Sequence, residues 1–423
     1  MQQIISKRGK AIAWLLTLIY FASYLMRKNF DIMLARITTD FVSSGAYSTI
    51  EAAESSVAIV SMIMTVTYGA GQIICGIIGD RVKPQTMLTC GLSLAAACNV
   101  AMFFCPSVPF MVAVWGINGF AHSMLWPPIV RLMSTYLNDA EYGYSSVRVS
   151  WGSSIATILL YLLCPIALGF MSWRAIILLC SIGGTGILIF WVICQKRIFA
   201  NDCIPTSTVG QRETASDKKK RSRLPIYVFL PLALIMLSIL LQGALRDGVT
   251  NWTPSILSQT YGLPEESAIF YTVVPSVLSM ISFYVFDILY RKVFKSEIVC
   301  ASVIFIFSAA CSFILYVSNI FFPSVFIAVI SVSLIIACMH GVNFMLITVV
   351  PKRFVRFGKV STFSGLLNAW TYVGASIATP GFALLKKASE GSWNTGILAW
   401  GIISILGAAV CIATFPLWRK FCK

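Results

Sequence analysis

The sequence predicts an all-α membrane protein with twelve transmembrane helices, and its composition, its charge-free runs and the placement of its basic residues support this. Of the 423 residues, 58% are apolar and only 11% are charged, against about 25% charged residues in an ordinary soluble domain. So few charges do not cover the surface of a soluble protein of this size, so soluble globular and disordered classes are nearly excluded. One helical span takes about 20 apolar residues, and the apolar total matches about twelve spans.

Charge-free stretches define the individual spans. Two of them are too long for one crossing, and we expect breaks at 105–109 and at 319–323, where prolines interrupt the apolar pattern. The count is then twelve, and helices extend past these limits wherever a charged side chain lies inside the bundle. The stretches are 11–26, 55–79, 84–130, 149–173, 175–195, 224–245, 267–286, 298–351, 360–385 and 391–418.

The basic residues predict the orientation and the division of the chain. With the N-terminus in the cytoplasm, most lysines and arginines fall in cytoplasmic segments, so both termini are expected there. This topology explains much of the net charge of +16, and we expect no nucleic-acid partner. A polar, basic stretch then predicts a cytoplasmic linker at 196–224 between two six-helix halves, 1–195 and 225–423.

Two pairs of residues at nearly the same spacing support an internal repeat. Arg27 in the first span corresponds to Arg246 in the seventh, and His122 in the fourth corresponds to His340 in the tenth. Histidine titrates near neutral pH, so both histidines are candidates for proton coupling. A hydrogen-bonded packing role between helices is the favoured interpretation for each one alone.

Arg27 and Arg246 are the main candidates for substrate binding. A guanidinium inside the membrane costs at least about 2.5–3.5 kcal/mol on insertion scales, and its planar fork binds carboxylate or phosphate oxygens in pairs. The alternative is that each arginine ends its helix and extends to the interface. Asp31 shares a helix face with Arg27 and is expected to neutralise it in part, whereas Asp247, adjacent to Arg246, is expected to be a poorer internal partner.

Several motifs resemble one known family. A glycine- and aspartate-containing loop between spans two and three matches the signature of the major facilitator fold, and we interpret its residues as a gating motif: Gly76, Asp80 and Arg81. The first, fourth, seventh, tenth and eleventh spans resemble those of the organophosphate:phosphate antiporters, which include the glycerol-3-phosphate and hexose-phosphate transporters. The matching stretches begin with Tyr20-x-x-x-Tyr24-Leu25-x-Arg27-Lys28, Trp126-Pro127-Pro128, Arg246-x-x-x-x-x-Trp252, Pro351-Lys352 and Tyr372-Val-Gly374.

The resemblance implies a major facilitator fold and a phosphate site. Arg27 and Arg246 would bind phosphate, and four tyrosines would line the cavity: Tyr20, Tyr24, Tyr68 and Tyr372. The partners would be a phosphorylated substrate, inorganic phosphate and the lipid bilayer, with the protein a monomer in a bacterial inner membrane. We expect no cofactor and no metal ion.

Two departures from the glycerol-3-phosphate members stand out. A cavity lysine on span two corresponds to Gln72, and a histidine on span five corresponds to Gly152, while Arg148 lies one turn away. Arg148 would therefore set the potential of the cavity. Because Asp31 and Asp247 are also present, the cavity is a candidate site for a zwitterionic phosphate or phosphonate.

These residues predict a secondary transporter that exchanges an organic phosphate for inorganic phosphate. Two facing arginines repel when the site is empty, and a bound dianion compensates both, so only the loaded carrier changes state. A proton-coupled organic-anion symporter of the same fold and a transporter-like sensor of a phosphorylated metabolite are the alternatives. An enzyme is the weakest interpretation, because no nucleophile–base pair or metal cluster is evident.

Overall fold

A computed structural model describes residues 5–199, 224–264 and 270–422. Within these ranges the chain is helical, and none of the described residues forms a β-strand. Its first helices are α1 (Lys7–Ile32), α2 (Leu34–Ser43), α3 (Ile50–Gly79), α4 (Pro84–Phe103), α5 (Val108–Ser123), α6 (Trp126–Tyr136), α7 (Asp139–Leu168) and α8 (Trp173–Phe199). The later elements are η2 (Ile226–Val228), α9 (Phe229–Tyr261), α11 (Val273–Leu289), η3 (Tyr290–Phe294), α12 (Glu297–Phe321), α13 (Val325–Asn343), η4 (Phe344–Val349), η5 (Val350–Phe357), α14 (Val360–Ala388) and α15 (Asn394–Cys422).

The helices belong to two compact units. Unit 1 comprises Met1–Lys220 and Gly358–Leu366, and unit 2 comprises Arg221–Phe357 and Leu367–Lys423. The first turns of α14 therefore belong to unit 1 and the rest of that helix to unit 2. Most of the predicted linker 196–224 lies outside the described residues, but α8 continues through its first part to Phe199.

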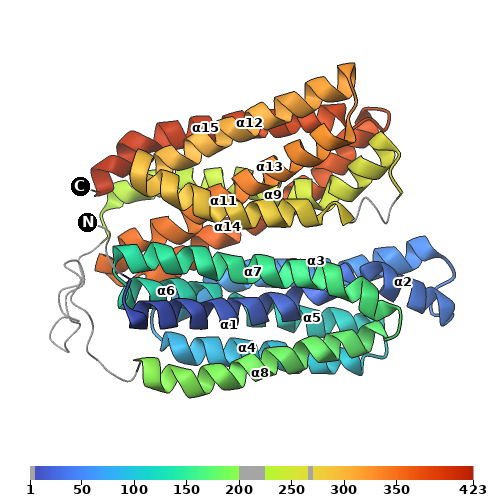
Figure 1. Cartoon of the computed structure of the whole chain (residues 1–423), viewed down its shortest axis with the longest axis horizontal. Coiled ribbons are helices and arrows are strands. Elements are labelled where there is room, and N and C mark those ends of the chain that lie inside the picture. Colours follow the sequence, from blue (N-terminus) through green and yellow to red (C-terminus); the bar gives the residue numbers. More distant parts are fainter. Residues whose placement is uncertain (1–4, 200–223, 265–269, 423) are drawn as a thin grey trace. The chain divides into compact units, whose positions relative to one another are not determined.

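Unit 1 is a bundle in which neighbouring helices run side by side (Figure 1). Helix α1 packs chiefly against α7, α3 against α5, and α4 against α8. The predicted break at 105–109 is confirmed, since α4 ends at Phe103 and α5 begins at Val108. A second interruption, between α5 and α6, falls directly before Pro127 in the first turn of α6, where a missing backbone N–H does no harm.

Unit 2 is a second bundle, formed by α9, α11, α12, α13, α15 and most of α14. Helix α12 packs against α15 and α13, and α9 packs against α15 and α13. The predicted break at 319–323 is confirmed, because α12 ends at Phe321 and α13 begins at Val325 with Ser324 as its N-cap.

Eleven helical segments among the described residues are long and apolar enough to cross a membrane. The predicted span 360–385 corresponds to α14, which is not among the eleven. Its sequence carries buried polar side chains that lower its hydropathy: Ser361, Ser364, Asn368 and Thr371. Buried polar residues of this kind face a bundle interior rather than lipid, and the role of α14 as the twelfth span stays a prediction.

The helices extend well past the charge-free limits. Helix α1 contains Arg27 and Asp31, and α9 continues to Tyr261 although the predicted span ended at residue 245. Arg246 consequently lies in the middle of a 33-residue helix rather than at a helix end. The charge-free rule places a boundary at the first charge and therefore shortens helices whose charges lie inside a bundle.

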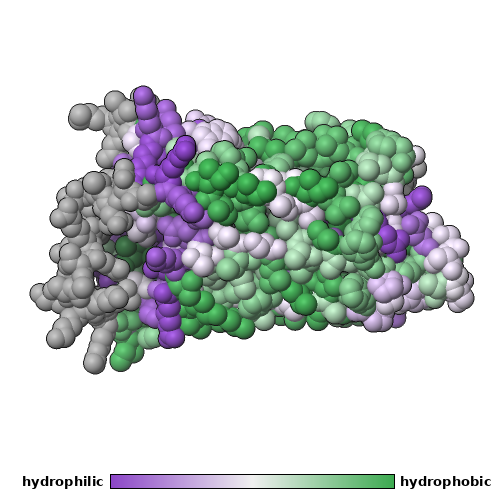
Figure 2. Space-filling model, turned by 90° about the horizontal axis from the view of Figure 1, so that it is seen from below, coloured by the Kyte–Doolittle hydropathy of each residue, from purple (hydrophilic) through white to green (hydrophobic). Residues whose placement is uncertain are grey.

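The surface has the polarity expected of a membrane protein. Figure 2 shows a face on which hydrophobic residues cover the middle and hydrophilic residues gather toward the two ends. Large apolar side chains are widely exposed, among them Phe313, Phe326 and Ile377. A soluble monomer rarely exposes so extensive an apolar surface, whereas hydrocarbon chains accommodate it.

Candidate functional site

Arg27 lies near the end of α1 and is only 7% exposed. Its guanidinium carbon lies 4.0 Å from the centre of the Tyr68 ring and 5.7 Å from that of Tyr24. Each such contact contributes about 0.5–2 kcal/mol, more when water is excluded. A buried guanidinium between aromatic rings does not extend to an interface, so the structure supports the internal interpretation of Arg27.

Tyr20 extends this group of aromatic residues along α1. Its ring centre lies 5.0 Å from that of Tyr24 and 5.1 Å from that of Trp126. Three of the four tyrosines that the resemblance implied for the cavity therefore gather with Arg27; we call Arg27, Tyr20, Tyr24 and Tyr68 the Arg27 cluster. Trp126, named in the sequence only as part of a matching stretch, adds an aromatic wall to this cluster.

A buried network of amides holds the backbone of α1 beside Arg27. Asn99 donates to the Met26 carbonyl at 2.9 Å, and Asn118 donates to the same carbonyl at 3.3 Å. Asn29 donates to the side-chain oxygen of Asn99 at 2.8 Å. All three asparagines are completely buried, and buried amides that are bonded in this way fix one arrangement of the helices. Asparagines inside apolar spans are the feature of the sequence that signals this network, which the predicted site did not include.

The two histidines lie near the ends of α5 and α13. The Nδ1 atom of His122 lies 3.0 Å from the Ser23 hydroxyl of α1. The ring of His340 packs edge-on against that of Phe283, with the ring centres 5.7 Å apart. The hydrogen bond of His122 supports the packing interpretation for that residue, while proton coupling stays a prediction for both.

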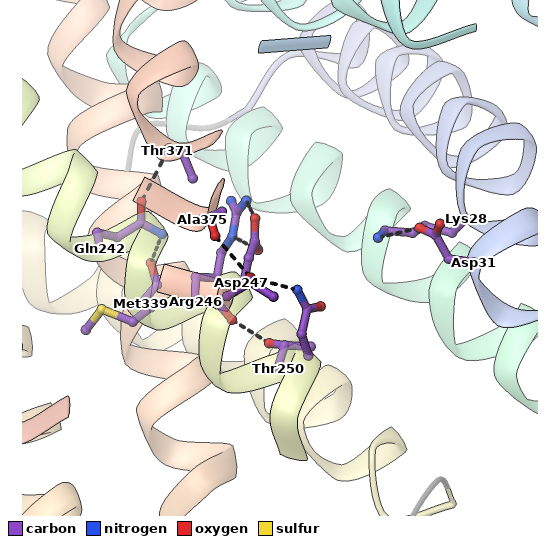
Figure 3. A network of polar contacts seen from close by, with 11 residues as sticks. Lys28, Asp31, Gln242, Arg246, Asp247, Thr250, Met339, Thr371 and Ala375 are labelled. Carbon is purple, nitrogen blue, oxygen red and sulfur yellow. Dashed lines mark hydrogen bonds and ion pairs between the residues drawn. The ribbon is translucent and has the colours of Figure 1, made fainter. Parts of the chain in front are cut away.

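Asp31 has a different partner from the one expected. Its carboxylate lies 3.1 Å from the Lys28 ammonium, as Figure 3 shows, and it accepts a hydrogen bond of 2.7 Å from Ser61. Lys28 thus engages the carboxylate that the sequence analysis assigned to Arg27. The pair is about one-third exposed on both sides, so water screens it.

Arg246 forms a two-point ion pair with its neighbour in sequence (Figure 3). Its Nε donates to Oδ1 of Asp247 at 2.7 Å, and its Nη2 donates to Oδ2 at 2.8 Å. The expectation that Asp247 would be the poorer internal partner is therefore wrong. Adjacent side chains leave a helix in different directions, but the long arginine stem bends back far enough to reach the shorter aspartate.

Close packing of α9 on α14 brings Tyr372 to this pair. A Cβ atom on Gly243 would overlap the backbone of Thr371, and one on Gly374 would overlap the backbone of α9. The absence of both side chains allows the two helices to touch. The Tyr372 ring, itself 7% exposed, then lies 5.8 Å from the guanidinium carbon of Arg246. We call Arg246, Asp247 and Tyr372 the Arg246 cluster.

Polar contacts on the turns of α9 before and after Arg246 reinforce this arrangement. Gln242 is completely buried; it donates to the Met339 carbonyl at 3.1 Å and accepts from the Thr371 hydroxyl at 3.4 Å (Figure 3). Thr250, one turn after Arg246, donates to the Arg246 carbonyl at 2.5 Å. Hydrogen bonds on the turns before and after Arg246 thus hold the part of α9 that carries its side chain.

Arg148 belongs to a separate group of aromatic residues. Its guanidinium carbon lies 3.3 Å from the ring centre of Tyr144, 5.5 Å from that of Trp151 and 5.9 Å from that of Trp14. Trp14 precedes Arg27 by 13 residues of α1, which is about 20 Å of helix rise. The structure therefore does not bring Arg148 into the Arg27 cluster.

The two departures from the glycerol-3-phosphate pattern have local explanations. A Cβ atom on Gly152 would lie 2.5 Å from the Thr17 carbonyl oxygen, so a histidine at this position would force α1 and α7 apart. Gln72 is completely buried, and neither its Oε1 nor its Nε2 has a hydrogen-bond partner among the described residues. A buried amide without hydrogen bonds lowers the stability of the fold. This position therefore carries a polar but uncharged side chain where the glycerol-3-phosphate members carry lysine.

The predicted gating motif binds the beginning of α14 within unit 1. Asp80 accepts hydrogen bonds from the backbone N–H groups of Ser361 at 2.9 Å and Thr362 at 3.1 Å. A carboxylate at a helix N-terminus satisfies N–H groups that have no partner inside the helix. Gly76 allows this approach, since a Cβ there would lie 2.8 Å from the Ser361 carbonyl oxygen. Arg81 is exposed beside them, and a gating role for the three residues stays a prediction.

Arg27 thus lies with three tyrosines in unit 1, and Arg246 lies beside Tyr372 in unit 2. Guanidinium and phenol groups are donors that bind an oxyanion reversibly. Among the described residues, no group of three or more histidine, cysteine or acidic side chains is placed to hold a metal ion. The guanidinium and phenol donors at both clusters suit a negatively charged, oxygen-rich group.

Comparison with known proteins identifies a family and a fold. A model of the Major Facilitator Superfamily matches residues 16–379. In fold, the chain resembles the proton:xylose symporter XylE with a TM-score of 0.77 over 96% of this chain and 95% of that one, at 13% identity.

Curated relatives include three membrane proteins of low identity. A probable hexose phosphate transport protein of Chlamydia muridarum is 26% identical over 37% of this chain and 32% of its own length. The glycerol-3-phosphate transporter of Bacillus subtilis is 24% identical over 59% of this chain and 57% of its own. The membrane sensor protein UhpC of Salmonella typhimurium is 21% identical over 58% and 55%. The chain thus spans about a third to just over half of the length of these relatives.

Proposed function

Since the chain belongs to the Major Facilitator Superfamily, we propose that it is a secondary transporter that exchanges an organic phosphate for inorganic phosphate across a bacterial inner membrane. Relatives named as hexose-phosphate and glycerol-3-phosphate transporters support the substrate class. Arg27 and Arg246 are the proposed phosphate-binding residues, and Tyr20, Tyr24, Tyr68 and Tyr372 are the proposed hydroxyl donors.

The observation that carries this proposal is the burial of Arg27 among tyrosines. Only 7% of the residue is exposed, and the Tyr68 ring covers its guanidinium at 4.0 Å. Aromatic contacts of this kind offset part of the cost of removing a guanidinium from water. A phosphate oxygen pair at the guanidinium fork supplies the stronger, charge-assisted compensation.

The pairing of Arg246 with Asp247 changes the expected basis of exchange. The carboxylate of Asp247, at 2.7 Å, compensates the charge of Arg246 before substrate arrives. In our proposal, repulsion between the two arginines therefore contributes less to the exchange mechanism than the sequence predicted. Bound phosphate still adds charge-assisted hydrogen bonds to the guanidinium groups, so the loaded carrier changes state more readily than the empty one.

Proteoliposomes loaded with inorganic phosphate test the proposal. External labelled phosphate should enter only when the lumen contains phosphate or an organic phosphate, and entry should not require a pH gradient. Uptake into empty vesicles that follows an imposed pH gradient would overturn the exchange mechanism and favour the proton-coupled symporter.

A second function is favoured by the similarity to the membrane sensor protein UhpC. In this alternative the chain binds a phosphorylated metabolite and signals to a partner. Binding of glycerol phosphate or a hexose phosphate to the purified protein, measured without any phosphate exchange in vesicles, would replace the transporter proposal with the sensor.

A further inference from the structure

We infer that the organic phosphate carries a positively charged amino group, and that Asp247 binds this group beside Arg246. The inference rests on the proposed phosphate site and names the class of substrate: a zwitterionic phosphate or phosphonate. Its basis is the two-point ion pair in the Arg246 cluster, together with the exposures of the two partners.

The geometry of the pair assigns different edges to the two charges. Asp247 occupies the edge of the guanidinium formed by Nε and Nη2, at 2.7 and 2.8 Å. The opposite edge, with one N–H of each terminal nitrogen, has the fork geometry that suits two phosphate oxygens. A phosphate bound at that edge therefore approaches Arg246 without displacing the aspartate.

Charge then discriminates among phosphates. Arg246 and Asp247 sum to zero, so a phosphate dianion at the guanidinium meets a carboxylate in its immediate surroundings. The repulsion acts at short range, because Asp247 bonds to the same guanidinium that the phosphate would bind. An ammonium group on the same substrate removes this repulsion and adds a charge-assisted hydrogen bond to the carboxylate.

The exposures of the two side chains fit this role. The Arg246 side chain is 12% exposed and that of Asp247 is 29% exposed. Each carboxylate oxygen accepts more than one hydrogen bond, so Asp247 can hold Arg246 and receive an ammonium group together. The more accessible partner of the pair is thus the anion, which selects a cationic group.

A purely positioning role for Asp247 makes a different prediction. If the carboxylate only orients Arg246, then Asp247→Asn weakens the binding of every phosphate by a similar factor. If it binds the amino group, the same substitution weakens only the aminated substrates and strengthens the others. Two ligands that differ in one group distinguish the roles.

The matched ligands are O-phosphoethanolamine and 2-hydroxyethyl phosphate, which differ by an ammonium in place of a hydroxyl. We expect O-phosphoethanolamine to inhibit labelled-phosphate exchange at a concentration at least about tenfold lower, the ratio supplied by one charge-assisted hydrogen bond. In Asp247→Asn, the ratio should fall to about one, with 2-hydroxyethyl phosphate binding more tightly than in the native protein. Asp40→Asn is the matched control, because Asp40 forms an i,i+4 ion pair with Arg36 on α2, outside both clusters, and its ratio should stay native.

Equal inhibition by the two ligands in the native protein overturns the inference, and so does a preference that persists in Asp247→Asn. The native ratio alone decides the matter if the variant does not fold. Ligand-induced thermal stabilisation of the purified full-length protein gives the same ratio without transport. If exchange is absent but the stabilisation ratio is preserved, the transporter proposal is refuted and the ammonium site is supported. If exchange occurs without any preference between the two ligands, the transporter proposal is supported and the ammonium site is refuted.

Discussion

Replacing Arg27 with lysine tests whether the guanidinium itself, rather than a positive charge, binds the substrate. Arginine offers a planar fork of donors and stacks on aromatic rings, whereas lysine is a strongly hydrated point charge. In the structure, the guanidinium carbon lies 4.0 Å from the Tyr68 ring centre and 5.7 Å from that of Tyr24. Arg27→Lys keeps the charge but removes the fork and weakens both ring contacts.

The expected magnitude follows from these contacts. Loss of one charge-assisted hydrogen bond costs about 1.5–3 kcal/mol, which corresponds to about a 10- to 150-fold loss of affinity. The weakened ring contacts affect the empty and loaded protein alike and therefore add little to this difference. We expect the concentration of phosphate that half-saturates exchange to rise by at least about tenfold.

The assay is labelled-phosphate exchange in phosphate-loaded proteoliposomes at a series of external concentrations. Arg174→Lys is the control, since Arg174 also lies on an aromatic ring, with its guanidinium carbon 4.2 Å from the centre of the Trp173 ring, but outside the Arg27 cluster. A half-saturating concentration for Arg27→Lys within about threefold of the native value would refute the reasoning, as would an equal loss in the control.

Three further changes test helix packing and ion pairs within the two units, each by the thermal melting of the purified protein. Gly152→His should destabilise by about 1–3 kcal/mol or more because it overlaps the Thr17 carbonyl, and unchanged melting would show that α1 and α7 are not packed as described. Asp80→Asn should cost about 0.5–2 kcal/mol through loss of its charged cap on α14; a more stable variant would contradict that role. Arg353→Met should cost about 1.5–3 kcal/mol, because it leaves the buried Glu297 carboxylate without its two-point partner at 3.0 and 3.1 Å, and equal melting of the two proteins would refute this.

The spans were predictable because charge-free length is a property of the chain itself. Both internal breaks followed from proline inside two charge-free runs that are too long for one crossing, and the structure confirms them at 105–109 and 319–323. The ends of helices were less predictable: α9 passes through Arg246 and Asp247 and ends only at Tyr261. A charge ends an apolar run in the sequence, but a paired charge inside a bundle does not end a helix.

The site was predictable where a motif fixed neighbours on one helix. Tyr20 and Tyr24 lie one helical turn apart, and their contact with each other and with the region of Arg27 follows from that spacing. Contacts set by side-chain reach or by another helix were not predictable. The folding back of Arg246 onto Asp247 and the distance of Arg148 from the Arg27 cluster belong to this second group.

Counterflow of labelled phosphate tests the central claim most directly. Vesicles that contain the native protein and unlabelled phosphate are diluted into a trace of labelled phosphate, beside vesicles with an empty lumen and vesicles with Arg27→Lys. Exchange predicts transient accumulation of label in the native loaded vesicles and little entry in the other two. Equal entry into loaded and empty vesicles, or undiminished counterflow in the Arg27 variant, would contradict the account.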